Sequence, residues 1–144
     1  MKCFFDTSVL VAACVRQHPH FVRARHALES VASGRDEGAI SAHSVGEMYS
    51  ALTNLPLLPR ILPAEAERII RTNVKAHFRC QPVTTAMYEA AIDVCVRQSF
   101  AGGKVYDALL LECARKAECK RLYTFNVRDF RRLAPDLADR IVAP

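Results

Sequence analysis

Short apolar segments that alternate with helical patterns constrain the fold of this chain more than any other feature. The apolar segments at 2–5, 37–40, 78–83, 121–125 and 140–143 are expected to be strands. Strands separated by helices pair in parallel, and helices then cover both faces of their sheet. The sequence therefore predicts an α/β fold, a three-layer α/β/α sandwich with a central, mostly parallel sheet of about five strands.

Helices are expected between these strands. The apolar spacing predicts helices at 7–15, 21–32, 63–74, 104–114 and 127–133, and two more that run from caps at Ser41 and Thr84 to about Asn54 and Gln98. No linker or repeat interrupts this order. We therefore expect one domain, residues 1–144, which is long enough to bury a core.

Composition narrows the class of protein. The six cysteines form no CxxC pair, which favours a reduced, cytoplasmic setting. No apolar stretch approaches the roughly 20 residues of a membrane span, and Asp6 interrupts the apolar run near the start where a signal peptide needs an unbroken one. We expect no contact with a membrane. The net charge of +5 mildly favours polyanionic partners such as nucleic acid.

Asp107 continues an apolar stripe. In a helix it shares a face with Leu110, Leu111 and Ala114. An acid in the first turn gains ~0.3–1 kcal/mol from the helix dipole, but burial of an unpaired carboxylate costs far more. A cation, or water in a cleft, must therefore meet this side chain.

Three further acids, Asp6, Glu47 and Asp129, also follow predicted strands. Each has a local alternative: Asp6 and Asp129 suit helix caps, and Ser44 with Glu47 matches a capping box unless Ser41 is the cap. Their shared position after the strands favours a ligand-binding site over three separate caps, because ligands in α/β folds bind beyond the carboxyl ends of the strands.

Such a group of carboxylates repels itself without a counter-ion. Hard divalent cations prefer oxygen ligands, and magnesium keeps several waters for substrate phosphates. A bound metal lowers the pKa of water and neutralises charge on phosphate oxygens. The acids thus favour phosphodiester hydrolysis.

The segments "FFDTSVLVA", "SVGEMYSAL", "GGKVYDALLLECA" and "YTFNVRDF" resemble, in order and spacing, the signatures of PIN-domain ribonucleases. The resemblance covers essentially the whole chain, and the short single-domain form is similar to the VapC-type toxins of toxin–antitoxin pairs. It implies a PIN-like fold, with Asp6, Glu47, Asp107 and Asp129 as metal ligands and catalytic acids.

The same resemblance implies the cofactor, the supporting residues and the partners. Thr7, Ser8 and Asn126 would orient the acids or a bound water around Mg²⁺, for which Mn²⁺ could substitute. The chain would be an endoribonuclease that cuts RNA by attack of water, leaving a 5′-phosphate and a 3′-hydroxyl. A cognate antitoxin would silence it, and two copies would form a homodimer.

Several basic residues lie close to Asp129 in the sequence: Arg115, Lys116, Lys120, Arg121, Arg128, Arg131 and Arg132. They are either a solvated rim or phosphate contacts beside the acidic centre. Lys104 and Arg128 stand nearest the motif acids and are the first candidates for contact with RNA. The five histidines show no H-x-x-x-H pairing and are not expected to bind metal.

Other functions remain open at this point. Haloacid-dehalogenase-like phosphotransferases need a second acid two residues after the first, where this chain has Ser8, so that mechanism is disfavoured. A PIN nuclease in RNA maturation is an alternative, as is a PIN domain that binds RNA or a protein without cutting. Loss of an acid would signal the latter, and all four acids are present.

Overall fold

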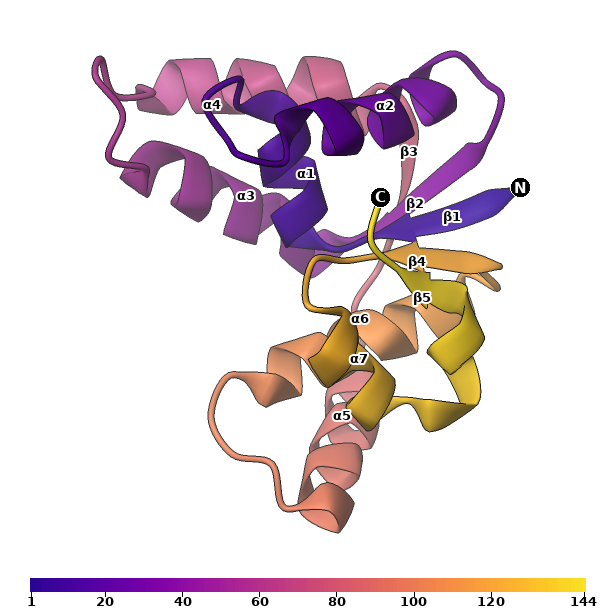
Figure 1. Ribbon diagram of the computed structural model, residues 1–144. Helices are drawn as coiled ribbons and strands as arrows, with labels where there is room; N and C mark the ends of the chain where they lie inside the picture. The colour runs from indigo at the N-terminus through magenta and orange to yellow at the C-terminus, as the bar shows by residue number, and fades with distance from the viewer.

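The computed structural model describes all 144 residues and contains one sheet of five parallel strands (Figure 1). The strands are β1 (Lys2–Phe5), β2 (Glu37–Ser41), β3 (Phe78–Gln81), β4 (Arg121–Tyr123) and β5 (Ile141–Val142). Their order in the sheet is β3-β2-β1-β4-β5, and every neighbouring pair is parallel. The predicted central parallel sheet is therefore confirmed.

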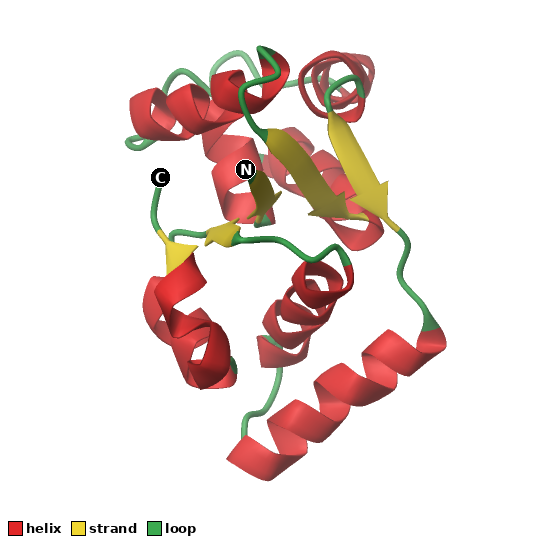
Figure 2. Cartoon of the chain, turned by 90° about the vertical axis from the view of Figure 1, so that its right-hand side faces the viewer, coloured by secondary structure: helices red, strands yellow, loops and turns green.

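Seven α-helices complete the three predicted layers (Figures 1 and 2). One face of the sheet is covered by α1 (Thr7–Cys14), α2 (Phe21–Ala32), α3 (Ala42–Asn54) and α4 (Pro63–Ile70). The other is covered by α5 (Thr85–Gln98), α6 (Lys104–Lys116) and α7 (Val127–Leu133). None of these helices combines the length and the apolar composition that crossing a bilayer requires.

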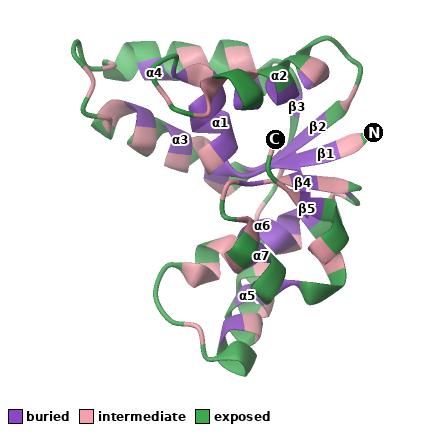
Figure 3. Cartoon of the chain, viewed as in Figure 1, coloured by how far each residue is buried: buried purple, intermediate pink, exposed green.

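The strands separate two apolar cores, because successive side chains of a strand point to opposite faces. In β1, Cys3 and Phe5 belong to the core under α1–α4, whereas Phe4 belongs to the core under α5–α7. In β2, Ile40 and Ala39 divide in the same way. Both faces of the central strands are thus buried (Figure 3), which explains their continuous apolar sequence.

Element boundaries differ from the expected ones in a few places. The helix expected at 63–74 ends at Ile70 and continues as a π-helical turn, Arg71–Lys75. The side chains of Thr72 and Asn73 donate to the carbonyls of Arg68 and Ile69, and so compete with the helical amides. A 3₁₀ segment, Pro135–Arg140, also precedes β5 where none was expected.

The strand order fixes where a site can form. From β1, the next two strands, β2 and β3, are added on one side of the sheet. The chain then crosses over, and β4 and β5 are added on the other side of β1. The carboxyl ends of β1 and β4 therefore meet at the point where the order reverses. In open parallel sheets this is the crevice in which ligands bind.

Gly38 is the tightest point in the sheet. A Cβ atom there would lie 2.5 Å from Cδ1 of Phe78 and 2.6 Å from Cγ1 of Val31, and the Phe78 ring is itself held edge-on against Phe5. We expect Gly38→Ala to lower the free energy of unfolding by roughly 1–3 kcal/mol through overpacking. Urea denaturation followed by circular dichroism measures the change.

Gly46 provides the matched control for this prediction. It lies on the exposed surface of α3, and a Cβ atom there meets nothing within 4 Å. Gly46→Ala should raise stability by roughly 0.5–1 kcal/mol, because alanine loses less backbone entropy in a helix. Equal effects of the two substitutions would contradict the packing argument.

Candidate active site

An open cleft of about 660 Å³ lies at the carboxyl ends of the central strands. Three of the four predicted acids line it, namely Asp6, Glu47 and Asp107. The remaining wall contains Thr7, Ser8, Val11, His18, Pro19, His20, Ala51, Phe125 and Asn126. Segments from across the chain thus contribute to one surface, as the strand order requires.

Asp6 directly follows β1 and occupies the N-cap position of α1, but its side chain makes no capping hydrogen bond. Its Oδ2 atom instead accepts hydrogen bonds from Ser8 Oγ at 2.7 Å and from Thr124 Oγ1 at 2.8 Å. The residue is only 7% exposed. Burial raises the pKa of the Asp6 carboxyl, although the bonds from Ser8 and Thr124 oppose that shift.

Glu47 lies inside α3 and not at its start. Ser41 caps this helix by accepting a hydrogen bond from the amide of His43, whereas Ser44 is fully buried and its Oγ has no partner. The capping-box alternative is therefore excluded, and the Glu47 side chain is free to face the cleft. Its Oε1 atom accepts a hydrogen bond from Thr7 Oγ1 at 3.0 Å and lies 3.6 Å from Nε2 of His43.

Asp107 stands in the first turn of α6, half-buried at the edge of the cleft. The leucines and the alanine that share its face are buried in the core under α5–α7. Burial raises the pKa of Asp107 to about 6; the charges of Asp6, Asp129 and Glu47 add to this, and Lys104 opposes it. The Asn126 amide donates to Oδ2 of Asp107 at 3.4 Å.

Asp129 is the third residue of α7 and differs from the other acids in having a direct cationic partner. Lys104 Nζ forms an ion pair with its Oδ2. Hydrogen bonds from Lys104 and then from Asn126 lower the pKa of Asp129. Asn126 therefore contacts both Asp107 and Asp129, and its side chain does not cap α7.

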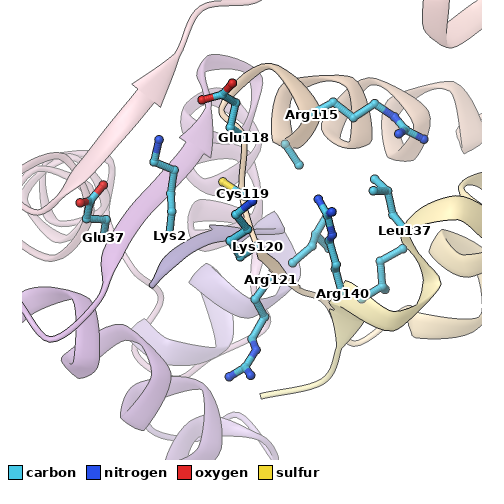
Figure 4. A pocket seen from close by; sticks show the side chains of 12 residues that line it. Lys2, Glu37, Arg115, Glu118, Cys119, Lys120, Arg121, Leu137 and Arg140 are labelled. Atoms are coloured by element: carbon cyan, nitrogen blue, oxygen red, sulfur yellow. The ribbon is translucent and has the colours of Figure 1, made fainter.

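The basic residues predicted to flank the acids divide between two ends of the sheet. Arg121 begins β4, whereas the acidic cleft lies beyond the end of that strand. Arg115, Lys120 and Arg121 instead line a separate cleft of about 700 Å³ with Lys2 (Figure 4). Of the two alternatives for these three residues, phosphate contacts beside the acidic centre are disfavoured, because the length of β4 separates them from the acidic cleft.

The acidic cleft offers carboxylate oxygens of the kind that hard divalent cations prefer, but its acids do not form a complete ligand set in this arrangement. Asp6 and Asp107 offer carboxylate oxygens, and no ion pair of the molecule involves either of them. Burial raises the pKa of both carboxyls, and at Asp107 the nearby charge of Asp6 adds to this shift. No three acidic, histidine or cysteine side chains are close enough together here to form a metal-ligand group. Glu47 and Asp129 are engaged by Thr7 and Lys104.

Thr124 is a site residue that the sequence did not reveal. It is fully buried, and it both donates to Asp6 and accepts from the amide of Asn126 at 3.0 Å. The available signal was a hydroxyl residue near the end of the strand predicted at 121–125, inside the quoted "YTFNVRDF" segment; the observed β4 ends one residue before it. His18, His20 and Phe125 were also not expected in the cleft.

Comparison with known families agrees with this geometry. The sequence model of the PIN domain matches residues 3–135, which is nearly the whole chain. Ribonuclease VapC27 of Mycobacterium tuberculosis is 33% identical over 105 residues, which cover 73% of this chain and 71% of that protein. The chain belongs to the PIN domain family.

Solved structures share the fold at lower identity. The crystal structure of M. tuberculosis VapC20, a toxin that cleaves the sarcin–ricin loop, superimposes with a TM-score of 0.68 at 22% identity, covering 88% of this chain and 92% of that one. A toxin–antitoxin complex from Klebsiella pneumoniae gives a TM-score of 0.66 at 20% identity and covers 99% and 97%. These likenesses confirm the predicted PIN-like fold.

The raised pKa of Asp107 predicts a pH dependence of stability. An aspartate in the unfolded chain titrates near ~4, whereas Asp107 in the fold titrates at about 6. Its favourable contribution is therefore present below the unfolded pKa and is lost as the pH rises through the folded pKa. In metal-free buffer at pH 7, Asp107→Asn should be more stable than the wild type by on the order of 1 kcal/mol, allowing for solvent screening of a half-buried group.

Urea denaturation of both proteins over pH 3.5–7.5 (about the range that spans both titrations) measures this difference. The two stability curves should converge at the acidic end and separate towards neutral pH. A difference that does not change with pH would refute an elevated pKa at Asp107.

Proposed function

We propose that this chain is a metal-dependent endoribonuclease and the toxin of a toxin–antitoxin pair. The observation that carries the proposal is that buried Asp6 and half-buried Asp107, neither of which forms an ion pair, line one cleft on a chain of the PIN family. The curated relative with 33% identity is named a ribonuclease, which supports RNA as the substrate. All four acids are retained, and this disfavours a PIN domain that binds without cutting.

Hydroxyl and amide groups orient the proposed catalytic acids. Ser8 and Thr124 both bind Oδ2 of Asp6, and Oδ1 receives no side-chain hydrogen bond. Asn126 binds Oδ2 of Asp107 in the same one-sided manner. The side-chain hydrogen bonds thus engage one oxygen of each carboxylate and leave the other without a side-chain partner.

Mg²⁺ is the proposed cofactor, with Mn²⁺ as a substitute, and Asp6 and Asp107 are its first proposed ligands. A bound divalent ion would lower the pKa of a water and neutralise charge on the phosphate. Glu47 would join through the oxygen that Thr7 leaves free, and Asp129 would need to loosen its pair with Lys104. Lys104 would then be free to contact an RNA phosphate, and the exposed Arg128 is the second proposed contact.

The partners follow from the proposed function. Structures with the same fold include a complex of a toxin with its antitoxin, which supports a cognate antitoxin for this chain. A homodimer and a cytoplasmic site of action complete the proposal. All six cysteines are free, as a reducing compartment would keep them.

Cleavage assays test the nuclease activity directly. With magnesium, the wild type should cut structured RNA into fragments with 5′-phosphate ends, and a chelator should abolish the cutting. Asp6→Asn and Asp107→Asn should reduce the rate by roughly 100-fold or more, as expected when an electrostatic group of the transition state is lost. Sequencing gels of end-labelled RNA provide the rates.

Asp93→Asn is the matched control, because Asp93 is an exposed aspartate on α5, outside the cleft. It should cleave as the wild type does. Equal cleavage by the wild type, Asp6→Asn and Asp107→Asn, with or without chelator, would rule out this active site.

Metal binding can be tested without cleavage. A cation that binds only the folded state stabilises it, by ~2.7 kcal/mol at about 100 times its Kd. Magnesium should therefore raise the Tm of the wild type and of Asp93→Asn by similar amounts, and that of Asp107→Asn clearly less. Calorimetry measures the three shifts, and identical shifts would argue against a metal at Asp107.

A further inference from the structure

An aromatic cluster, consisting of His18, His20 and Phe125, forms part of the wall of the acidic cleft. The rings of His20 and Phe125 stack with centroids 4.5 Å apart and planes 27° apart. The ring of His18 is nearly parallel to that of Phe125, at 22° and 6.3 Å. The cluster joins the loop between α1 and α2 to the loop after β4. Two segments distant in sequence therefore present stacked rings beside Asp6 and Asp107.

Hydrogen bonds fix the orientation of the two imidazoles. The backbone amide of His20 donates to Nδ1 of His18, and Arg23 Nη2 donates to Nδ1 of His20, each at 3.1 Å. Because an amide and a guanidinium can only donate, both Nδ1 atoms act as acceptors, which places the ring protons on Nε2. Each imidazole thus retains an N–H donor at Nε2.

The cluster also has a cation next to it. The guanidinium of Arg23 lies over the Phe125 ring, 5.8 Å from its centroid, and Arg23 is exposed. Arg23 is a further basic residue, distant in sequence from those near Asp129. Flat ring faces and N–H donors therefore lie in this part of the cleft, with one cation in contact with the rings, whereas the part around Asp6 and Asp107 contains carboxylates.

Packing alone accounts for only one member of the cluster. Phe125 is partly buried against the core under α1–α4 and closes its edge. His18 and His20 belong to neither core, and both remain partly exposed in the cleft. Two oriented polar rings stacked over a phenylalanine at the mouth of a site are a surface for a planar, polar ligand.

An unpaired RNA base matches this surface. Proteins that read single-stranded or looped RNA stack its bases on Phe, His and Arg planes and bind base edges by hydrogen bonds. Here the face of the base would stack on the rings, and its acceptor atoms would accept hydrogen bonds from the Nε2–H groups. Arg23 would contact an adjacent phosphate. The rings and the carboxylates of Asp6 and Asp107 line the same cleft.

We propose that the His18–His20–Phe125 cluster, with Arg23, binds one unpaired base of the RNA next to the phosphate that is cut. This inference rests on the proposed ribonuclease function and adds a specificity-determining subsite to it. The cluster would favour RNA in which a base is already unstacked, such as a loop or a single strand.

Binding is tested in an Asp107→Asn background, which removes cleavage. The probe is a single-stranded RNA of about ten nucleotides, within the span that one binding groove covers, with 2-aminopurine placed at each position in turn. Stacking should quench 2-aminopurine fluorescence at one position. His20→Ala and Phe125→Leu should relieve the quenching there and weaken binding roughly 5- to 150-fold, as expected for loss of one base stack.

His26→Ala is the matched control, because His26 is an exposed histidine on α2 outside the cleft. Its affinity and quenching should equal those of the parent. Phe125→Leu keeps an apolar side chain against the core, and His20→Ala leaves that core untouched, so the two variants separate stacking from folding. Thermal unfolding confirms that each is folded.

The possible failures are distinguishable. If wild-type protein cleaves RNA, yet His20→Ala and Phe125→Leu bind the probe as tightly as the parent and leave the quenching unchanged, the stacking site is wrong and the nuclease function stands. Weakened binding of the antitoxin with unchanged binding of RNA would also overturn it. If the wild type neither cleaves nor binds RNA, the proposed function fails and the subsite fails with it.

Discussion

The carboxylate of Asp6 is held between two hydroxyl groups, and the geometry of the site depends on this arrangement. Ser8 approaches it from α1 and Thr124 from the end of β4, so one oxygen atom ties together the two strands at which the sheet order reverses. Hydroxyl groups can bind a carboxylate without cancelling its charge. The arrangement therefore positions the Asp6 carboxylate and leaves its charge uncompensated. An ion pair at the same place would also have positioned the carboxylate, but it would have neutralised the charge.

The distribution of charge separates long-range attraction from local chemistry. The chain carries a net charge of +5, yet the cleft at the carboxyl ends of the strands is lined by three acids. Lys2, Lys120 and Arg121 lie at the opposite end of the sheet. A polyanion is drawn to such a molecule as a whole, but close approach to the acids requires a cation between them and the phosphate. In the proposed ribonuclease, cation binding and substrate binding would thereby be coupled.

The features that local sequence patterns determine could be predicted from the sequence. The strand and helix order follows from apolar periodicity, and the placement of Asp6 in the cleft follows from the rule that parallel strands end at one edge. Asp107 lies on a helix that follows another helix, so its place in the same cleft was indicated by the resemblance to PIN-domain ribonucleases and not by that rule. Contacts between distant segments could not be predicted. The bond of Thr124 to Asp6 spans 118 residues, and the pair of Lys104 with Asp129 spans 25. Neither has a sequence pattern, because both depend on how the layers pack.

Because β1 lies in the middle of the sheet, the site can form only late in the synthesis of the chain. A protein chain emerges from the ribosome with its N-terminus first, so Asp6 is made early, but its partner Thr124 follows almost the entire domain. A nascent chain that stops before Arg121 lacks β4, Thr124 and Asn126, and the carboxylate of Asp6 then keeps only Ser8. Incomplete chains therefore cannot form the cleft described above, and the site would assemble only after synthesis has passed Asn126.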